Sequence, residues 1–216
     1  SQLHGRYPPK TVPLADGTEM LIRQAEVAEV PTLLRIVRPL RWVKVDDYDR
    51  VTGHVVGDLS AWQSGQRRDP YCLLGFVDGV LAGLVTGRAR EGRRATSYHA
   101  LALHRGLRVG ALLLAAKMEH LLEVLGEKEI WIATDNALGH RRWLAEYPLE
   151  ARRGYGSADG QTCWVLTREV YLASRPRLVS GQRPVDPELL SKSRRLVAPD
   201  LSELTDGAAE AFEARL

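Results

Sequence analysis

The stretch that decides the fold is Ser97–Leu125, SYHALALHRGLRVGALLLAAKMEHLLEVL. It begins as a short apolar run, breaks at a basic turn that contains glycine, and resumes at Gly110 with helical spacing. The apolar positions of the resumed part share one helical stripe: Leu114, Met118, Leu121 and Leu125. Lys117 and His120 fall away from that stripe, and Gly126 stands where a helix would close. The stretch therefore predicts a strand, a turn and a long helix.

The turn has the chemistry of an anion-binding site. A helix start presents unpaired backbone N–H groups and the positive end of the helix dipole, and both favour phosphate oxygens. Gly106 and Gly110 allow close approach of the backbone, while Arg105 and Arg108 add charges that can pair with a pyrophosphate. The alternative is an ordinary strand-to-helix corner whose arginines are solvated.

At these residues the sequence resembles the GNAT N-acyltransferases, whose signature is Gln/Arg-x-x-Gly-x-Gly/Ala between a strand and a long helix. The match falls at Arg105 and Gly110, and the departure falls at Arg108, where the family has its middle glycine. The resemblance covers roughly residues 18–172 and implies acetyl-CoA as cosubstrate, without a metal. It also implies that the turn binds this cosubstrate through Leu103, His104, Arg105, Gly106, Leu107, Arg108, Val109, Gly110 and Ala111.

The fold that the resemblance implies is α/β (α+β), with a mixed, mostly antiparallel central sheet flanked by helices and a C-terminal extension. The patterns along the chain predict strands at 18–25, 129–134, 150–155 and 161–171, and a hairpin at 71–87 around Asp78-Gly79. They predict helices at 26–37, 48–63 and 137–147. We expect an extended arm at 1–17, the acyltransferase domain at 18–173, and a linker with a helical tail at 174–216.

In this family a neutral amine attacks the thioester directly, so a base must take a proton and an acid can protonate the departing thiolate. His99 is the candidate base, because imidazoles titrate near neutral pH, and a core histidine is the alternative. Asn136 matches the asparagine that the family has after the following strand, and it joins the predicted cofactor-binding residues. Trp143 stands where the family often has a tyrosine acid, so Tyr147 becomes the candidate acid.

The segment between the first two helices borders the acceptor site in the resembled fold. Asp46 and Asp47 are therefore candidate ligands for a cationic amine. The alternative for such residues is capping of the helix that follows.

Composition bounds the class of protein. A chain of 216 residues with 44% hydrophobic residues can bury one substantial core. A net charge of +3 suits an anionic cosubstrate and does not argue for nucleic acid. The basic hairpin tip from Arg88 to Arg94 lacks interleaved aromatic residues, so we expect a solvated loop there and no nucleic acid partner, and contact of the tip with an acidic partner or RNA is the alternative.

Other patterns concern the compartment. Cys72 and Cys163 lie in apolar runs, which favours buried thiols over a single disulfide. No Cys or His pair has the spacing of metal ligands, no apolar run is long enough for a membrane span, and residues 1–17 do not form a signal peptide. These features predict a soluble cytoplasmic protein.

Two functions follow from the sequence. The first is an N-acyltransferase that moves an acetyl or other short acyl group from acyl-CoA to the amine of a small molecule or protein. The second is a GNAT-shaped protein that has lost catalysis and serves as a binding or assembly subunit. Arg105, Gly110 and Asn136 favour the first, while Arg108 and Trp143 favour the second.

The final segment, 201–216, repeats apolar residues at spacings of three and four, with carboxylates on the rest of its surface. We expect this stripe to dock either on its own domain or on a second copy of the chain in a homodimer. A frayed acidic tail is the alternative.

Overall fold

The structure, a computed structural model, describes residues 5–66, 70–89, 94–132, 146–152, 163–202 and 204–205. Within these ranges the chain forms an eight-stranded sheet in the order β1-β2-β3-β4-β5-β6-β8-β7. The strands are β1 (Lys10–Pro13), β2 (Glu19–Gln24), β3 (Pro70–Val77), β4 (Val80–Arg88), β5 (Arg94–Ala102), β6 (Glu129–Ile132), β7 (Glu150–Arg152) and β8 (Cys163–Thr167).

All neighbouring strands pair antiparallel except β5 and β6, which are parallel. The predicted mixed, mostly antiparallel sheet is therefore confirmed. The hairpin between β3 and β4 turns at Asp78 and Gly79, whose φ angles of 49° and 78° are those of a primed turn. β1 lies inside the predicted extended arm and pairs with β2 as an outer strand of the sheet.

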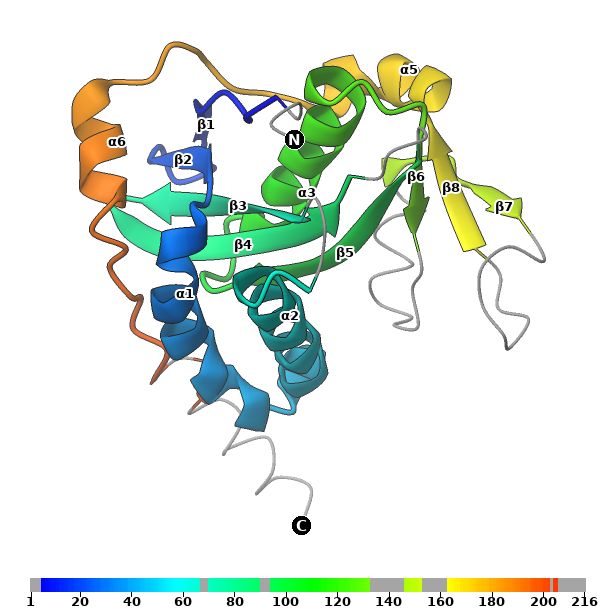
Figure 1. The fold of residues 1–216 in the computed structure, drawn as a ribbon. Coiled ribbons are helices and arrows are strands. Elements are labelled where there is room, and N and C mark those ends of the chain that lie inside the picture. The colour runs from blue at the N-terminus through cyan, green and yellow to red at the C-terminus, as the bar shows by residue number, and fades with distance from the viewer. Residues whose placement is uncertain are drawn as a thin grey trace.

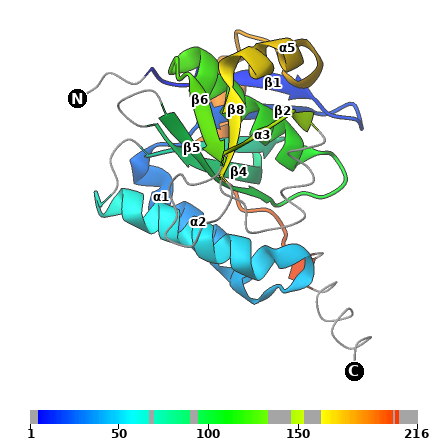
Figure 2. The same ribbon diagram turned by 90° about the vertical axis from the view of Figure 1, so that its right-hand side faces the viewer.

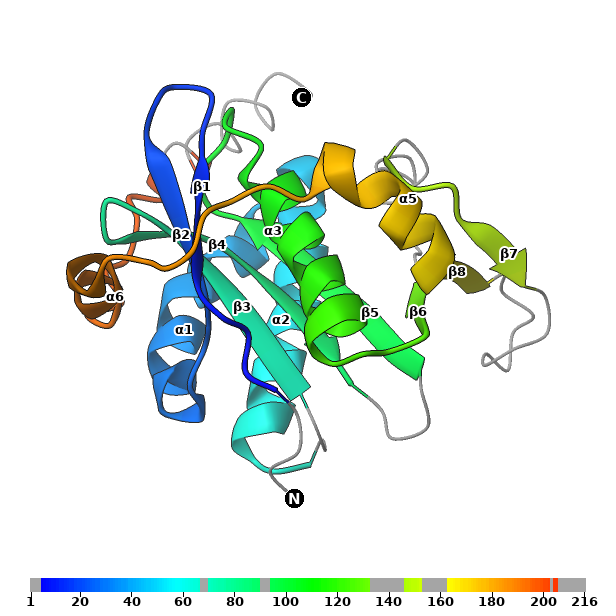
Figure 3. The same ribbon diagram turned by 90° about the horizontal axis from the view of Figure 1, so that it is seen from above.

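Helices cover both faces of the sheet (Figure 1). On one face lie α1 (Val30–Val37) and α2 (Tyr48–Gln63), joined by the 3₁₀ turns η2 (Arg38–Trp42) and η3 (Val45–Asp47). On the other face lie α3 (Val109–Glu119), which continues as a π-helical turn over His120–Val124, and α5 (Arg168–Leu178). Figures 2 and 3 show the two layers from the side and from above.

The last predicted strand, 161–171, is too long at its end. β8 stops at Thr167, and Arg168 begins α5. The cause is a helix cap, because the Thr167 hydroxyl accepts a hydrogen bond from the backbone N–H of Val170 at 3.3 Å. The short predicted helix at 137–147 falls mostly outside the described residues.

The prediction that Lys117 and His120 face away from the core is wrong. Both side chains are buried, because α3 is covered by the sheet on one side and by the N-terminal segment and α5 on the other. The ring of His120 packs edge-on against Tyr7, with 5.5 Å between the ring centroids. The neighbouring Glu119 is also buried and bonds Lys10 at 2.5 Å and Arg183 at 2.7 Å.

The segment after α5 crosses back over the sheet and contains the short helix α6 (Pro187–Ser193). Thr11 and Gln182 exchange two backbone hydrogen bonds, at 3.1 and 2.8 Å. Further along, Leu196 and Leu204 are buried in the same core cluster as α1 and α2. The described part of the predicted tail therefore packs on its own chain, and residues 206–216 lie outside the described residues.

We expect this packing to contribute substantially to stability. Leu196→Ala should lower the free energy of unfolding by roughly 2–5 kcal/mol, the usual range for a buried leucine. Leu172→Ala is the control, because Leu172 is 46% exposed and its truncation should change stability by less than about 0.5 kcal/mol. Urea unfolding measures both. Equal effects of the two leucine variants would contradict the stability role. Light scattering on a chain shortened after Ser180 tests separately whether the segment also holds a homodimer together.

Candidate functional site

The parallel strands β5 and β6 part at the place where a site could form. Their pairing runs from Arg94 opposite Glu129 to Ser97 opposite Ile132. Beyond Ser97, β5 continues to Ala102, and among the described strands only β4 pairs with this part. The carboxyl end of β5 therefore leads away from β6 and directly into the turn before α3 (Figure 1).

The turn leaves the start of α3 open. Arg108 occupies the cap position, and among the described residues no side chain makes a capping hydrogen bond there. Arg108 has φ 57° and ψ 27°, the left-handed conformation that glycine adopts most easily. Arg108, which stands where the signature has its middle glycine, therefore has a backbone conformation typical of glycine. For a residue with a side chain this conformation costs about 1 kcal/mol. A Cβ atom at Gly110 would be in ordinary van der Waals contact with the Ala102 Cβ, at 3.7 Å, and would meet no closer atom of the described residues outside its own helix backbone and chain neighbours.

The predicted cofactor residues divide into two groups. The side chains of Leu103 and Val109 are buried in the core, so they can offer a ligand only backbone groups. The others are at least partly exposed around the turn: His104, Arg105, Gly106, Leu107, Arg108, Gly110 and Ala111. Asn136 lies outside the described residues.

Both arginines of the turn bind carboxylates. Arg105 pairs with Asp46 at 2.8 Å and lies over the ring of Tyr48, while Arg108 pairs with Glu146 at 3.0 Å. Such exposed ion pairs contribute at most about 1 kcal/mol, so a phosphate group can replace the carboxylates. The contact also brings the predicted acceptor residue Asp46 next to the predicted cofactor residue Arg105.

The acceptor segment has an unusual backbone. Asp46 and Asp47 both have left-handed φ angles, 54° and 58°. Asp47 is the cap residue of α2, yet its side chain makes no capping hydrogen bond. Capping therefore does not explain Asp47. The segment is held against β5 by Tyr48, whose hydroxyl donates to the Ala102 carbonyl oxygen at 2.7 Å.

His99 belongs to a polar cluster under α2. Its Nδ1 lies 3.0 Å from the Asp58 Oδ2, and its ring stacks on His54 with 4.6 Å between centroids. Asp58 is buried, whereas the His99 side chain is 28% exposed. The same Asp58 oxygen accepts a hydrogen bond from the Thr86 hydroxyl at 3.0 Å. His99 therefore has a fixed orientation and partial access to solvent.

A β-bulge produces this arrangement. Val85 pairs with Ala100 and Gly87 with Ser97, so β5 carries one extra residue between these pairs. The backbone N–H of His99 donates to the Thr86 hydroxyl at 3.2 Å. On the other side of the sheet, the Lys117 Nζ donates to the Thr86 carbonyl oxygen at 2.9 Å. Polar contacts thus run through the sheet from α3 to α2.

Lys117 makes this cluster sensitive to pH. Burial lowers the pKa of its ammonium group from 10.5 to about 7, although the charges of Asp58 and Cys72 oppose the shift. The unfolded chain therefore binds one more proton than the folded chain between about pH 7 and 10.5. It follows that this group makes the protein more stable as the pH rises through that window.

Lys117→Met is expected to remove this gain and to stabilise the protein at pH 7. An apolar side chain of similar size avoids the cost of burying the ammonium group, and replacement of buried ionic groups by apolar ones is worth roughly 1–4 kcal/mol. Urea unfolding of both proteins at the two ends of the window measures the effect, because groups common to both cancel in the difference. The same pH dependence in the variant would show that Lys117 is not the group responsible.

Tyr147 lies in a different part of the core. It is fully buried in the cluster that includes α3, and burial raises the pKa of its hydroxyl. The group is thus protonated at neutral pH, as an acid must be. Trp143 lies outside the described residues.

Asp58 and Thr86 are candidate site residues that the sequence analysis missed. Asp58 could have been found, because it falls on the apolar stripe of α2 between Val55 and Leu59. A carboxylate in such a position needs a partner. Thr86 carries no comparable signal, because nothing in the sequence marks the bulge opposite it.

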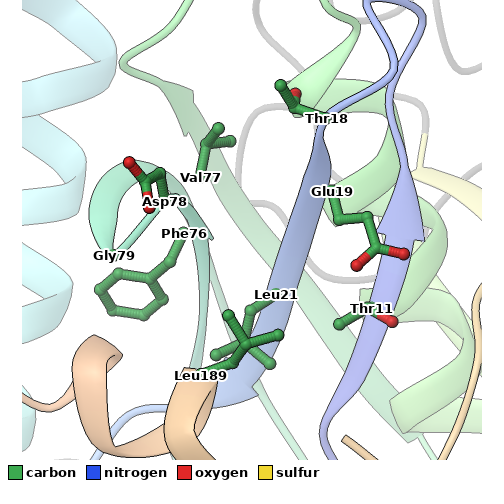
Figure 4. A pocket seen from close by; sticks show the side chains of 9 residues that line it. All are labelled: Thr11, Thr18, Glu19, Leu21, Phe76, Val77, Asp78, Gly79 and Leu189. Carbon is green, nitrogen blue, oxygen red and sulfur yellow. The ribbon is translucent and has the colours of Figure 1, made fainter. Parts of the chain in front are cut away.

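A pocket of about 230 Å³ lies elsewhere, between the β1–β2 hairpin, the β3–β4 turn and α6 (Figure 4). It is lined by Thr11, Thr18, Glu19, Leu21, Phe76, Val77, Asp78, Gly79 and Leu189. It contains none of the predicted site residues. Asp78 at its rim forms an ion pair with Lys192 of α6, which partly neutralises the charge of the Asp78 carboxylate.

Three further features concern metals, thiols and membranes. In the part of the chain that the structure describes, no group of His, Cys, Asp or Glu side chains could hold a metal ion. Cys72 is a free, fully buried thiol, and burial raises its pKa, which agrees with the expectation for this residue. Among the described helices none combines the length and apolarity of a bilayer span.

Comparison with known proteins places the fold. No protein-family model and no curated protein sequence matches the chain. An uncharacterized protein from Bacillus halodurans superposes with a TM-score of 0.55 at 12% identity, over 78% of this chain and 95% of that one. FdhC, described as a nucleotide-linked sugar GNAT, superposes with a TM-score of 0.52 at 12% identity, over 79% and 98%. This chain therefore has the GNAT fold.

Proposed function

We propose that this protein is an N-acyltransferase that moves an acetyl or other short acyl group from acyl-CoA to an amine. One observation carries the proposal: a single strand, β5, holds the buttressed His99 and then runs directly into the uncapped start of α3. A base and an anion site thereby stand at the same end of the sheet.

Acetyl-CoA is the proposed cosubstrate. The backbone N–H groups at the start of α3 would receive its pyrophosphate, and no described atom lies within 4 Å of the Cβ position at Gly106. Arg105 and Arg108 would exchange their carboxylate partners for phosphate oxygens. Asn136 remains a predicted contact.

His99 is the proposed base. In the tautomer that carries a proton on Nδ1, Asp58 accepts the hydrogen bond from Nδ1–H, and Nε2 is the nitrogen that would take a proton from the ammonium group of the acceptor. The neutral amine then forms the C–N bond while the C–S bond breaks and the thiolate departs. Asp58 stabilises the imidazolium that results. Tyr147 is the predicted source of the proton for the thiolate, and Asp46 and Asp47 the predicted contacts for the acceptor.

The alternative is a GNAT-shaped subunit without catalysis. Arg108 in place of glycine is one of the two residues that favour this alternative. Its left-handed backbone weakens that point, because Arg108 keeps the conformation expected of glycine. Calorimetry with acetyl-CoA, followed by thiol release with a panel of amines, tests the proposal. Binding with thiol release supports the enzyme, binding without it supports the subunit, and no binding contradicts the enzyme. A cytoplasmic location and a homodimer through the tail remain predictions.

A further inference from the structure

A line of cations runs along α1 and η2. Arg35, Arg38, Arg41 and Lys44 recur at every third residue, and the sequence from 31 to 45 contains no acidic residue. In an α-helix residues three apart are surface neighbours, and in a 3₁₀ helix they eclipse one another. The change from α1 to η2 at Arg38 therefore keeps Arg35, Arg38 and Arg41 on one side, and Lys44 follows beyond the extended residue Val43. We call these four residues and Trp42 the cationic strip.

The strip is exposed and unpaired. All four cations are exposed, and Trp42 is 85% exposed, an unusual position for the largest apolar side chain. Across the described ranges none of the five side chains has a hydrogen bond, ion pair or ring contact.

Three carboxylates near the ends of the strip have other partners. Before it, Glu26 pairs with Arg6 and Glu29 with Arg23. After it, Asp46 pairs with Arg105. The positive charge of the strip is thus not neutralised by these neighbours.

We propose that the cationic strip binds a single-stranded nucleic acid. Aligned cations attract successive phosphates, and an exposed indole offers a face on which one base can stack. Like charges in a row and an exposed tryptophan both disfavour the isolated protein. Both are satisfied at once by a ligand that alternates phosphates with flat rings.

Other anionic partners fit less well. A membrane surface needs a wide apolar face, whereas the strip has one aromatic side chain among cations. An acidic peptide would pair with the cations and leave the Trp42 ring without a matching group. A duplex keeps its bases stacked inside, so it too would leave the ring unused.

The strip ends at the candidate site. The Val43 carbonyl oxygen accepts the backbone N–H of Asp49 at 2.7 Å, which folds the strip back onto the acceptor segment. Two residues after Lys44, Asp46 reaches Arg105 of the turn. A single-stranded nucleic acid bound to the cationic strip would therefore bring an amine that is attached to it, or bound next to it, to the acceptor side of the candidate site. The delivery of an amine rests on the proposed acyl transfer, whereas the binding of the nucleic acid does not.

This inference departs from the expectation of no nucleic acid partner. That expectation was based on the hairpin tip at 88–94, which lacks aromatic residues and lies partly outside the described residues. The strip is a different surface, and its tryptophan supplies the missing ring.

The test uses fluorescence anisotropy of labelled oligouridylate RNA with the full chain, and oligothymidylate DNA in a second arm. The logarithm of the affinity should fall with the logarithm of salt with a slope of about −3, since each of four phosphate contacts contributes about −0.7. Trp42→Ala should weaken binding by about tenfold, and Trp42→Phe should retain most of it. Tighter RNA binding would identify RNA as the strand, and tighter DNA binding would identify DNA.

The charge variants provide the matched comparison. Arg38→Ala with Arg41→Ala should reduce the slope by about 1.4, the contribution of two contacts. Lys128→Ala with Arg177→Ala removes equal charge from exposed positions on the α3 side and should leave binding unchanged. Absence of binding, equal loss in both pairs, or preference for duplex DNA or anionic vesicles would overturn the proposal. Calorimetry with acetyl-CoA on the parent protein separates this failure from failure of the acyltransferase.

Discussion

Gly110→Glu is expected to abolish acetyl-CoA binding while the protein still folds. Among the described residues, the Cβ position at Gly110 has no heavy atom closer than the Ala102 Cβ at 3.7 Å, apart from its chain neighbours and its own helix backbone, so a Cβ atom there makes no clash. That position lies at the uncapped start of α3, where the pyrophosphate is proposed to bind. A carboxylate there adds both bulk and repulsion. Calorimetry measures the loss, and circular dichroism during heating checks the fold.

Two other glycine variants make the experiment specific. Gly53→Glu introduces the same group on the exposed face of α2, where nothing lies within 4 Å, and should leave binding intact. Gly110→Ala adds bulk without charge and should have an intermediate effect. If Gly110→Glu binds acetyl-CoA as tightly as the parent, the cosubstrate site is elsewhere.

His99→Ala is expected to lower the turnover rate by about 10²–10⁴-fold with little change in acetyl-CoA affinity, because proton transfer by a positioned base is typically worth that much. Asp58→Asn should also lower the rate strongly. The amide keeps the shape of the buried side chain but removes the charge that orients His99 and stabilises its protonated form. Thiol release at saturating amine measures the rates.

His54→Ala is the matched control for the base. His54 stacks on His99 but lies on the exposed side of the cluster, so its loss should affect the rate far less. Tyr147→Phe tests the proposed acid separately. Unchanged rates in His99→Ala and Tyr147→Phe together would leave positioning, or an acidic residue such as Asp46, as the source of catalysis.

The sequence predicted the elements whose signals are local. The hairpin at Asp78-Gly79 and the bounds of α2 follow from turn chemistry and apolar spacing, and the structure has both. The turn at Arg105–Gly110 was predicted from the same kind of pattern. Within this turn Arg108 has a left-handed backbone although it is not a glycine, which the sequence did not predict.

Features that depend on distant partners were not predictable. Lys117 and His120 lie off the apolar stripe of the sequence, and the sequence does not show that Lys117 faces the Thr86 carbonyl oxygen of the sheet or that the N-terminal segment covers His120. The contact between Asp58 and His99 joins residues 41 positions apart through a bulge that leaves no local mark. The role of a single residue was therefore easier to predict than the contacts between residues that are distant in the sequence.

The hydrogen bonds between Thr11 and Gln182 have a consequence beyond stability. β1 is the outermost strand on its side of the sheet, and an open strand edge is a template on which another chain can add a strand. Here the chain's own C-terminal segment occupies part of that edge. A mutation that loosens residues 181–205 would therefore expose a site for aggregation, and the first sign would be loss of solubility before loss of activity.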